Sequence, residues 1–108
     1  MTLSEKQAVF ARMIAQLIMT ADWLGYRVTF GDAYRSPAVT YGHKNSLHRK
    51  RLAIDLNLFT KNDAGTWVYK TSTKAHYPLG KYWESIGGIW GGRFGDGNHY
   101  SLGHGGMK

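Results

Sequence analysis

The chain has 108 residues, with 14 Lys and Arg against 7 Asp and Glu, a formal net charge of +7, and no cysteine. This length predicts one domain, residues 1–108, because domains usually contain about 100–150 residues. The lack of cysteine excludes disulfides, thiolate metal ligands and cysteine nucleophiles, so any metal site has to use His, Asp and Glu. The positive charge favours an anionic partner such as nucleic acid, phospholipid or an acidic envelope polymer, with a charge that only aids solubility as the alternative.

Apolar residues recur at helical spacing through residues 5–24, which predicts one amphipathic helix whose apolar stripe belongs to the core. Ser4 and Gln7 match a capping box at its start, and Gly25 supplies its end. Polar residues interrupt the most apolar stretch, so we do not expect it to span a bilayer. The first residues also lack the order of a signal peptide, which favours a chain made in a cytoplasm and dependent on another agent to leave it.

Strand patterns follow this helix. The clearest covers 52–59, where Ile54, Leu56 and Leu58 fall on one face and Asp55 falls on the other, toward a cleft. Further short strands are predicted at 26–30, at 66–69 and as a pair within 89–102. A second helix is predicted at 78–86, with Pro78 in its first turn and Gly87-Gly88 after its end. The order of these elements predicts an α+β fold: a small, largely antiparallel sheet with the N-terminal helix and the short second helix packed on it.

Two segments, 46–55 and 95–100, carry residue types that suit metal-dependent hydrolysis. A hydrolytic zinc site needs three imidazole or carboxylate ligands, an open position and a nearby carboxylate. His48 and Asp55, seven residues apart, would lie on opposite faces of one continuous strand. The chain before the strand therefore has to fold back for both to reach one ion.

The second segment contains Asp96-Gly97, a turn dipeptide, three residues before His99. A turn here lets Asp96 and His99 converge, which a straight strand forbids at this spacing. The flanking glycines also argue against a helical His-Glu-x-x-His site.

Ser46-x-His48, six further residues, Asp55, and a downstream Asp96-x-x-His99 form a paired motif. This motif resembles the zinc peptidases of the D-Ala-D-Ala carboxypeptidase and L-alanyl-D-glutamate endopeptidase family, which includes phage endolysins and vancomycin-resistance D,D-dipeptidases. The resemblance extends over most of the chain. It implies that His48, Asp55 and His99 bind one zinc ion per chain. It also implies that Asp96 is the general base that activates the attacking water and later protonates the leaving amine.

Two more roles follow from the same resemblance. Arg35, in Tyr34-Arg35-Ser36, matches a family arginine that would stabilise the oxyanion or hold a substrate carboxylate. Ser46 would support the site through a hydrogen bond. One departure concerns Arg51, because many members have glycine three residues after the first His.

Three further histidines, His43, His76 and His104, match no part of the motif and are expected at the surface. Tyr34, Trp90 and Tyr100 are expected to pack in the core or at the rim of the site rather than to bind substrate.

The resemblance implies a peptidase that cuts the stem peptide of bacterial peptidoglycan, with L-Ala–D-Glu favoured over D-Ala–D-Ala. We expect a monomeric phage lysis protein, made in the host cytoplasm, that acts on the wall in the periplasm after the membrane is permeabilised. The basic surface would help it hold the anionic envelope. Two alternatives stay open: a basic nucleic-acid-binding module that uses Arg49-Lys50-Arg51, against which no recognised RNA-binding pattern is present, and a non-catalytic relative that retains the zinc.

Overall fold

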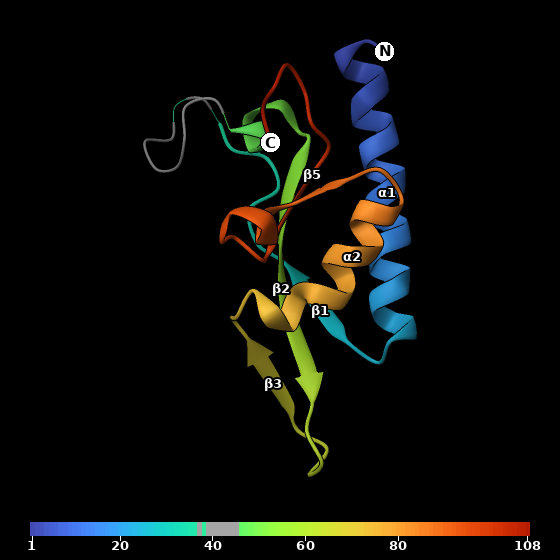
Figure 1. Ribbon diagram of the computed structural model, residues 1–108, viewed down its shortest axis with the longest axis vertical. Helices are drawn as coiled ribbons and strands as arrows, with labels where there is room; N and C mark the ends of the chain where they lie inside the picture. Colours follow the sequence, from blue (N-terminus) through green and yellow to red (C-terminus); the bar gives the residue numbers. More distant parts are fainter. Residues whose placement is uncertain (37, 39–45) are drawn as a thin grey trace.

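The structure is a computed structural model that describes residues 1–36, 38 and 46–108. Two α-helices and five strands give an α+β fold, as predicted, and Figure 1 shows their arrangement. The elements in chain order are α1 (Leu3–Trp23), β1 (Arg27–Phe30), the 3-10 turn η1 (Leu47–Lys50), β2 (Ala53–Lys61), β3 (Trp67–Lys70), the 3-10 turn η2 (Lys74–His76), α2 (Tyr77–Ser85), β4 (Ile89–Trp90), the 3-10 turn η3 (Gly91–Phe94) and β5 (His99–Ser101).

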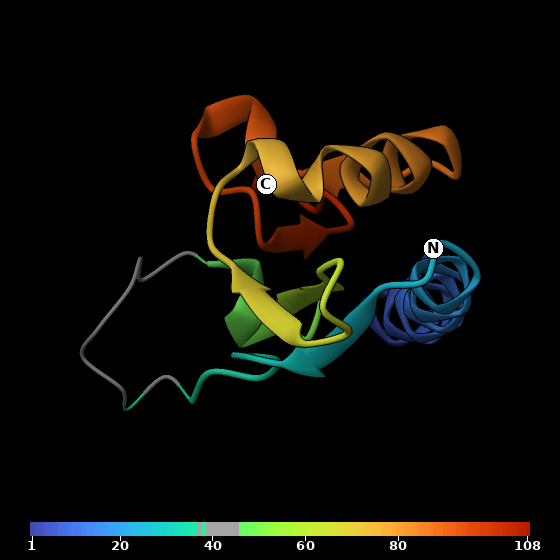
Figure 2. The same cartoon turned by 90° about the horizontal axis from the view of Figure 1, so that it is seen from below.

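The sheet is antiparallel throughout and is organised around β2, its longest strand. β1 pairs along one edge of β2, with Arg27 opposite Phe59. The other edge is shared: β5 pairs with the first part of β2, and β3 pairs with its last part. β4 extends the sheet beyond β5. Both helices lie on the same side of this sheet, as Figures 1 and 2 show together.

The core lies between the sheet and the two helices. Leu56 and Leu58 of β2 are fully buried, and Ile54 is nearly so, which confirms the predicted inner face of this strand. α1 contributes a buried stripe at helical spacing, and α2 contributes Leu79 and Trp83. The stripe consists of Phe10, Met13, Ile14, Leu17 and Ala21. Burial of this apolar surface is the main force that fixes the helices on the sheet.

The start of α1 differs from the prediction. The capping box consists of Thr2 and Glu5: the Thr2 hydroxyl accepts from the Glu5 N–H at 3.1 Å, and the Glu5 carboxylate accepts from the Thr2 N–H at 3.0 Å. Ser4 lies inside the first turn, and the Gln7 amide donates to the Lys50 carbonyl instead. Leu3 packs against the core, which explains why the helix begins two residues earlier than its most regular apolar spacing indicates.

The chain before α2 holds a second correction. His76, expected at the surface, is 2% exposed and lies at the end of η2 with its Nδ1 2.8 Å from the Tyr100 hydroxyl. Burial lowers the pKa of His76 to about 4. His104 is partly exposed and contacts Lys6, whereas His43 lies outside the described residues.

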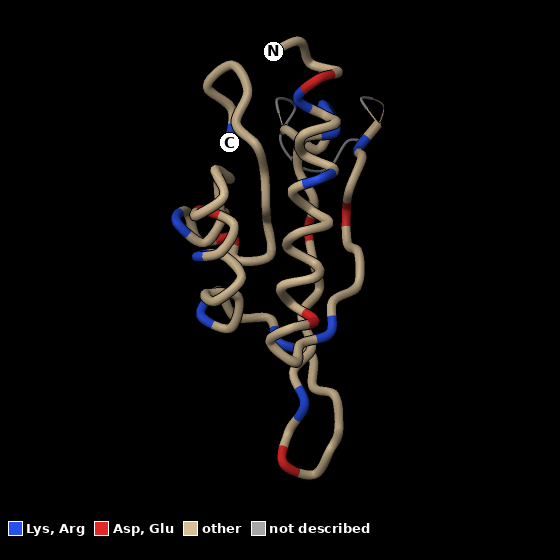
Figure 3. Tube along the Cα trace, turned by 90° about the vertical axis from the view of Figure 1, so that its right-hand side faces the viewer, with Lys and Arg blue, Asp and Glu red and all other residues tan. Residues whose placement is uncertain are grey.

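Charge is spread over the molecule. Figure 3 shows Lys and Arg along α1, α2 and the strands rather than along one helix face. Nowhere in the described chain does a helix combine the length and hydropathy that a bilayer crossing requires.

Candidate metal centre

His48 is placed by η1, a short turn that precedes β2. The Ser46 hydroxyl accepts a hydrogen bond from the His48 N–H at 3.2 Å and so caps the turn. Arg51 ends it in a left-handed conformation, with φ 56°, and the chain then enters β2. The turn provides the reversal of chain direction that the spacing of His48 and Asp55 requires.

Asp55 and His99 are directly opposite each other in the β2–β5 pair. Residues that face each other across an antiparallel pair project to the same side, so the two side chains lie on the face away from Ile54. The turn before β5 is closed by a hydrogen bond from the His99 N–H to the Asp96 carbonyl at 3.1 Å. Gly91 packs under this turn, and a Cβ there would collide with the Asp96 carbonyl and the His99 Cβ. The turn needs glycine at that position.

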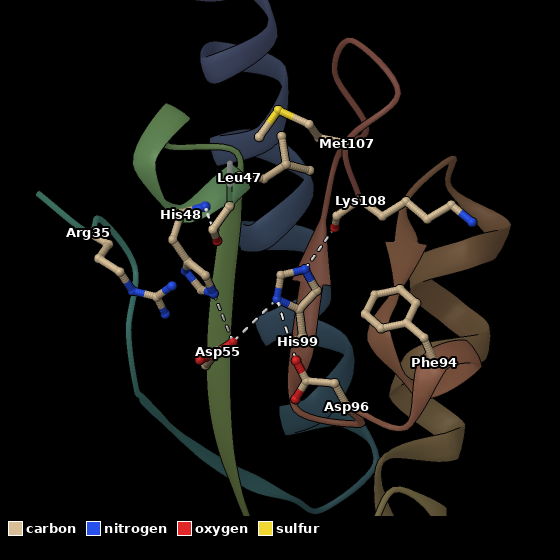
Figure 4. Close-up of a pocket in the computed structure, with 10 residues that line it drawn as sticks. Arg35, Leu47, His48, Asp55, Phe94, Asp96, His99, Met107 and Lys108 are labelled. Carbon is tan, nitrogen blue, oxygen red and sulfur yellow. Dashed lines mark hydrogen bonds and ion pairs between the residues drawn. The ribbon is translucent and has the colours of Figure 1, made fainter. Parts of the chain in front are cut away.

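Three donor atoms converge where these elements meet. The Nε2 atom of His48 lies 3.2 Å from Oδ1 of Asp55, and the Nδ1 atom of His99 lies 3.5 Å from the same oxygen. All three atoms are within 4.8 Å of one another, and Figure 4 shows them pointing to a common point. Two imidazoles and one carboxylate form the ligand set that hydrolytic zinc sites use.

In each histidine, the ring nitrogen that faces away from Asp55 (the outer nitrogen) determines whether the nitrogen that faces Asp55 (the inner nitrogen) carries a lone pair or a proton. Nδ1 of His48 lies 3.2 Å from the Ala33 carbonyl, and Nε2 of His99 lies 2.9 Å from the main-chain oxygen of Lys108. An oxygen of this kind only accepts, so each outer nitrogen carries the proton in the neutral ring. Each inner nitrogen then directs a lone pair at Asp55, whose Oδ1 is buried and has no well-formed hydrogen bond among the described residues. Three acceptors facing one another fit a bound cation.

The charges at the site couple metal binding to pH. Burial alone would raise the pKa of Asp55, but hydrogen bonds and positive charge from His48 and His99, when the rings carry a second proton, lower it to about 2. Burial alone would lower the pKa of His99, but Asp55, the main-chain oxygen of Lys108 and the charge of Asp96 raise it. Protons on the imidazoles therefore compete with a cation, more strongly as the pH falls.

A pocket of about 690 Å³ opens over the donors. The six residues predicted from the sequence all line it: Arg35, Ser46, His48, Asp55, Asp96 and His99. Asp96 is half exposed, and its Oδ2 lies 4.0 Å from Nδ1 of His99. Arg35 is 8% exposed, and its guanidinium pairs with Asp32 at 3.0 Å. The pocket thus combines three converging donor atoms, a half-exposed carboxylate next to one of them, and an arginine held by an ion pair.

A family model described as D-alanyl-D-alanine carboxypeptidase matches residues 40–102. This match covers more than half of the chain and includes all three donors and Asp96. The chain belongs to this family. Comparison with curated proteins gives no match. Arg35 precedes the matched segment, so the structure alone places it at this pocket.

Sequence reasoning missed several parts of this carboxypeptidase-family site. The Ala33 and Lys108 main-chain oxygens orient the two rings, but an acceptor of this kind leaves no residue signature. Phe94 packs edge-on against the His99 ring, with centroids 5.9 Å apart. Asp32 and Gly91 do have a visible signal. Asp32 is an acidic residue three positions before Arg35, and Gly91 lies in a glycine pair just before the Asp96 turn.

Proposed function

We propose that this chain is a zinc peptidase that hydrolyses the stem peptide of bacterial peptidoglycan, with L-Ala–D-Glu favoured over D-Ala–D-Ala as the bond cut. The observation that carries the proposal is the convergence of two imidazole lone pairs and a buried carboxylate oxygen, with Asp96 beside them. Membership of the D-alanyl-D-alanine carboxypeptidase family supports the substrate class and keeps the D-Ala–D-Ala bond as the alternative.

His48, Asp55 and His99 would hold one zinc ion per chain. Bound there, zinc would supply a Lewis acid that polarises the scissile carbonyl and acidifies water. The Ser46 cap and the two main-chain acceptors keep the imidazoles in place, so little reorganisation is needed on binding.

Asp96 has the position and exposure of a general base. Its carboxylate faces the pocket next to His99 but is not part of the converging donor set. It would take a proton from the attacking water as the new C–O bond forms, and return it to the amine nitrogen as the C–N bond breaks. Among the described residues its one ion pair is the 4.0 Å approach to His99, so this exposed carboxylate is free to carry out both transfers.

Arg35 would stabilise charge that develops on the substrate. Its guanidinium lines the pocket, and the Asp32 carboxylate fixes its orientation at 3.0 Å. The main-chain N–H of Arg35 donates to the His48 carbonyl at 3.1 Å, which ties this segment to η1, the turn that carries the proposed ligand His48. A planar donor held in this way suits an oxyanion or a substrate carboxylate.

For the biological setting, we propose a phage lysis protein that acts as a monomer on the periplasmic wall after the inner membrane is permeabilised. The motif resemblance to phage endolysins supports this setting, and the net charge of +7 suits an anionic envelope.

The test combines zinc content with wall hydrolysis. We expect one zinc per purified chain, and release of peptides from isolated peptidoglycan whose masses identify the bond cut. His99→Ala should lose both the zinc and the hydrolysis, and permeabilised Gram-negative cells should lose turbidity only with the intact protein. Zinc without hydrolysis, unchanged by Asp96→Asn, would favour a non-catalytic relative. Absence of zinc would reject the proposal and make DNA binding the next function to test.

A further inference from the structure

One face of the sheet, on the side away from the core, extends from the proposed metal site along β1, β2 and β3. The strand register places Asp55, Asn57, Phe59 and Lys61 on the side of β2 away from the core. Cross-strand partners share that side, so Thr29 and Arg27 of β1, and Tyr69 and Trp67 of β3, join the same surface. We refer to the surface formed by Arg27, Thr29, Asn57, Phe59, Lys61, Trp67 and Tyr69 as the open face.

The open face is accessible and is not part of the core. Tyr69 is 53% exposed, Arg27, Thr29 and Lys61 are exposed, and the remaining members are half-buried. Figure 2, viewed along β2, shows α1 to one side of these strands. At the end of the open face nearest α1, Arg27 and Trp67 also line a hollow with Asp22 of that helix.

The open face is continuous with the pocket. Gly31 lies beside Asp55 on the extension of β1, joined by a hydrogen bond from its N–H to the Asp55 carbonyl at 2.8 Å. A Cβ on Gly31 would lie 3.2 Å from the Asp55 Cβ and 3.7 Å from Oδ1 of Asn57. Because glycine has no side chain, nothing projects from the surface between the donor atom of Asp55 and Asn57. A polymer bound at the donors can therefore lie along the sheet.

The side chains of the open face are ordered in advance of binding. Asn57 donates to the Thr29 hydroxyl at 3.2 Å and accepts from the Tyr69 hydroxyl at 3.4 Å. The Phe59 and Tyr69 rings pack with centroids 5.2 Å apart and planes inclined by 37°. A row of linked hydroxyl and amide groups thus lies next to a pair of aromatic rings.

Two cations complete the open face. The Arg27 guanidinium lies 4.2 Å from the centre of the Trp67 ring, and the Lys61 ammonium lies 5.5 Å from it. In the described part of the chain, neither forms an ion pair with an acidic side chain. Their charge suits a ligand that carries carboxylates.

We propose that the open face binds the glycan strand of the peptidoglycan whose stem peptide occupies the metal site; this inference rests on the proposed function. Saccharides have apolar C–H faces that pack on aromatic rings and hydroxyls that pair with amides and hydroxyls, which are the groups present here. The free carboxylates of the stem peptides along the strand match the two cations. Nucleic acid fits less well, because only two cations accompany the rings.

Spacing supports the L-Ala–D-Glu bond. With about 3.3 Å per residue along β2, Asn57 lies ~7 Å and Phe59 ~13 Å from Asp55. One alanine and a lactyl group separate an L-Ala–D-Glu bond from the first sugar, a reach of about 7 Å at ~3.5 Å per unit. The first sugar would thus lie beside Asn57, and the next one over Phe59 and Tyr69. A D-Ala–D-Ala bond would place the first sugar about three further residues away.

The test separates glycan binding from catalysis. Wild-type protein is titrated with peptide-free glycan chains and, separately, assayed on a free stem pentapeptide and on the same pentapeptide carrying its disaccharide. Tyr69→Ala removes the most exposed ring of the open face, and Tyr69→Phe keeps the ring. Phe30→Ala is the matched control, because Phe30 is 64% exposed on the other face of the same sheet.

We expect Tyr69→Ala to weaken glycan binding and raise the KM for the disaccharide substrate by about fivefold to tenfold. Turnover of the free pentapeptide should stay within about twofold, and Tyr69→Phe and Phe30→Ala should behave like wild type. Equal losses on both substrates, or no glycan binding by a protein that cuts the free peptide, would overturn the inference. Glycan binding through Tyr69 without any peptide hydrolysis would support the open face and reject the proposed peptidase.

Discussion

Adjacent residues of β5 take part in two very different histidine environments. His99 faces the pocket and contacts Asp55, whereas Tyr100 faces the core and contacts His76. Both histidines are buried, at 7% and 2% exposure. Their pKa values nevertheless move in opposite directions: that of His99 is raised, and that of His76 falls to about 4.

The difference comes from the partners rather than from burial. Desolvation disfavours the charged imidazole in both places, but His99 is close to two carboxylates, and His76 has only a neutral phenol. A buried histidine is therefore a candidate ligand only when its inner nitrogen meets other donors. In this molecule the alternation of side chains along one short strand separates the candidate metal centre from the core histidine.

The largest expected effect contrasts the two histidines directly. His99→Ala should abolish stoichiometric zinc binding and reduce peptide hydrolysis by roughly 1,000-fold or more, because a ligand is lost. His76→Gln should keep one zinc per chain. Metal analysis of both purified variants checks the contrast, and zinc retained by His99→Ala would show that the donor set is misassigned.

Asp96→Asn tests the carboxylate beside His99 while leaving the donors intact. We expect kcat to fall by roughly 100-fold or more, since proton transfer is lost, with zinc content unchanged. Single-turnover kinetics would measure the rate of peptide cleavage, and metal analysis of the same sample would measure the zinc content. Loss of zinc in parallel with activity would instead make Asp96 a ligand.

Acid should destabilise the protein through His76. The unfolded residue has a pKa near 6.5 and the folded one near 4, so below pH 6.5 the unfolded chain binds the extra proton. The free energy of unfolding should therefore fall as the pH drops from about 6.5 to about 4, by up to ~3 kcal/mol from this residue.

Urea unfolding of the metal-free protein at several pH values would measure this contribution. His76→Gln should show a flatter dependence over the same range, because the titrating group is gone. His99 acts with the opposite sign: its raised pKa contributes stability at low pH that is lost as the pH rises through its folded value. An unchanged slope in His76→Gln would show that another group is responsible.

Ser46→Ala should have the smallest effect. The substitution removes the hydrogen bond that caps η1, next to His48, and should lower the free energy of unfolding by about 1 kcal/mol. Because η1 carries His48, we expect zinc affinity to fall by about tenfold, whereas the His76–Tyr100 contact is unaffected. A chelator-competition titration measures the affinity, and Ser4→Ala, which removes no cap, is the control.

Periodicity predicted the fold well where one face of an element packs on the core. The apolar stripe of α1 and the inner face of β2 belong to this class, because a residue's burial follows from its place in the repeat. The exact start of α1 was less predictable, because Thr2 with Glu5 and Ser4 with Gln7 both match a capping box, and the packing of Leu3 selects the first pair. His76 was misplaced because its environment comes from Tyr100, 24 residues away, and no local pattern carries that contact.

The convergence of His48, Asp55 and His99 could be predicted because their spacing requires a reversal before β2 and a turn before His99. The supporting contacts were not. Arg51 takes a left-handed conformation without being glycine, and its guanidinium lies 4.0 Å from the centre of the Tyr34 ring. That stacking depends on how the segment around residue 34 passes η1, which is a three-dimensional property.

The main-chain acceptors behind the two ligand rings have a consequence for mutational scanning. Every amino acid supplies the same oxygen, so replacing Ala33 or Lys108 leaves the hydrogen bond available. A scan of single substitutions would score both positions as tolerant even though they set the tautomer of each ligand. Only changes that displace the backbone itself, such as an inserted residue between Gly31 and Arg35, would reveal that the proposed metal site depends on them.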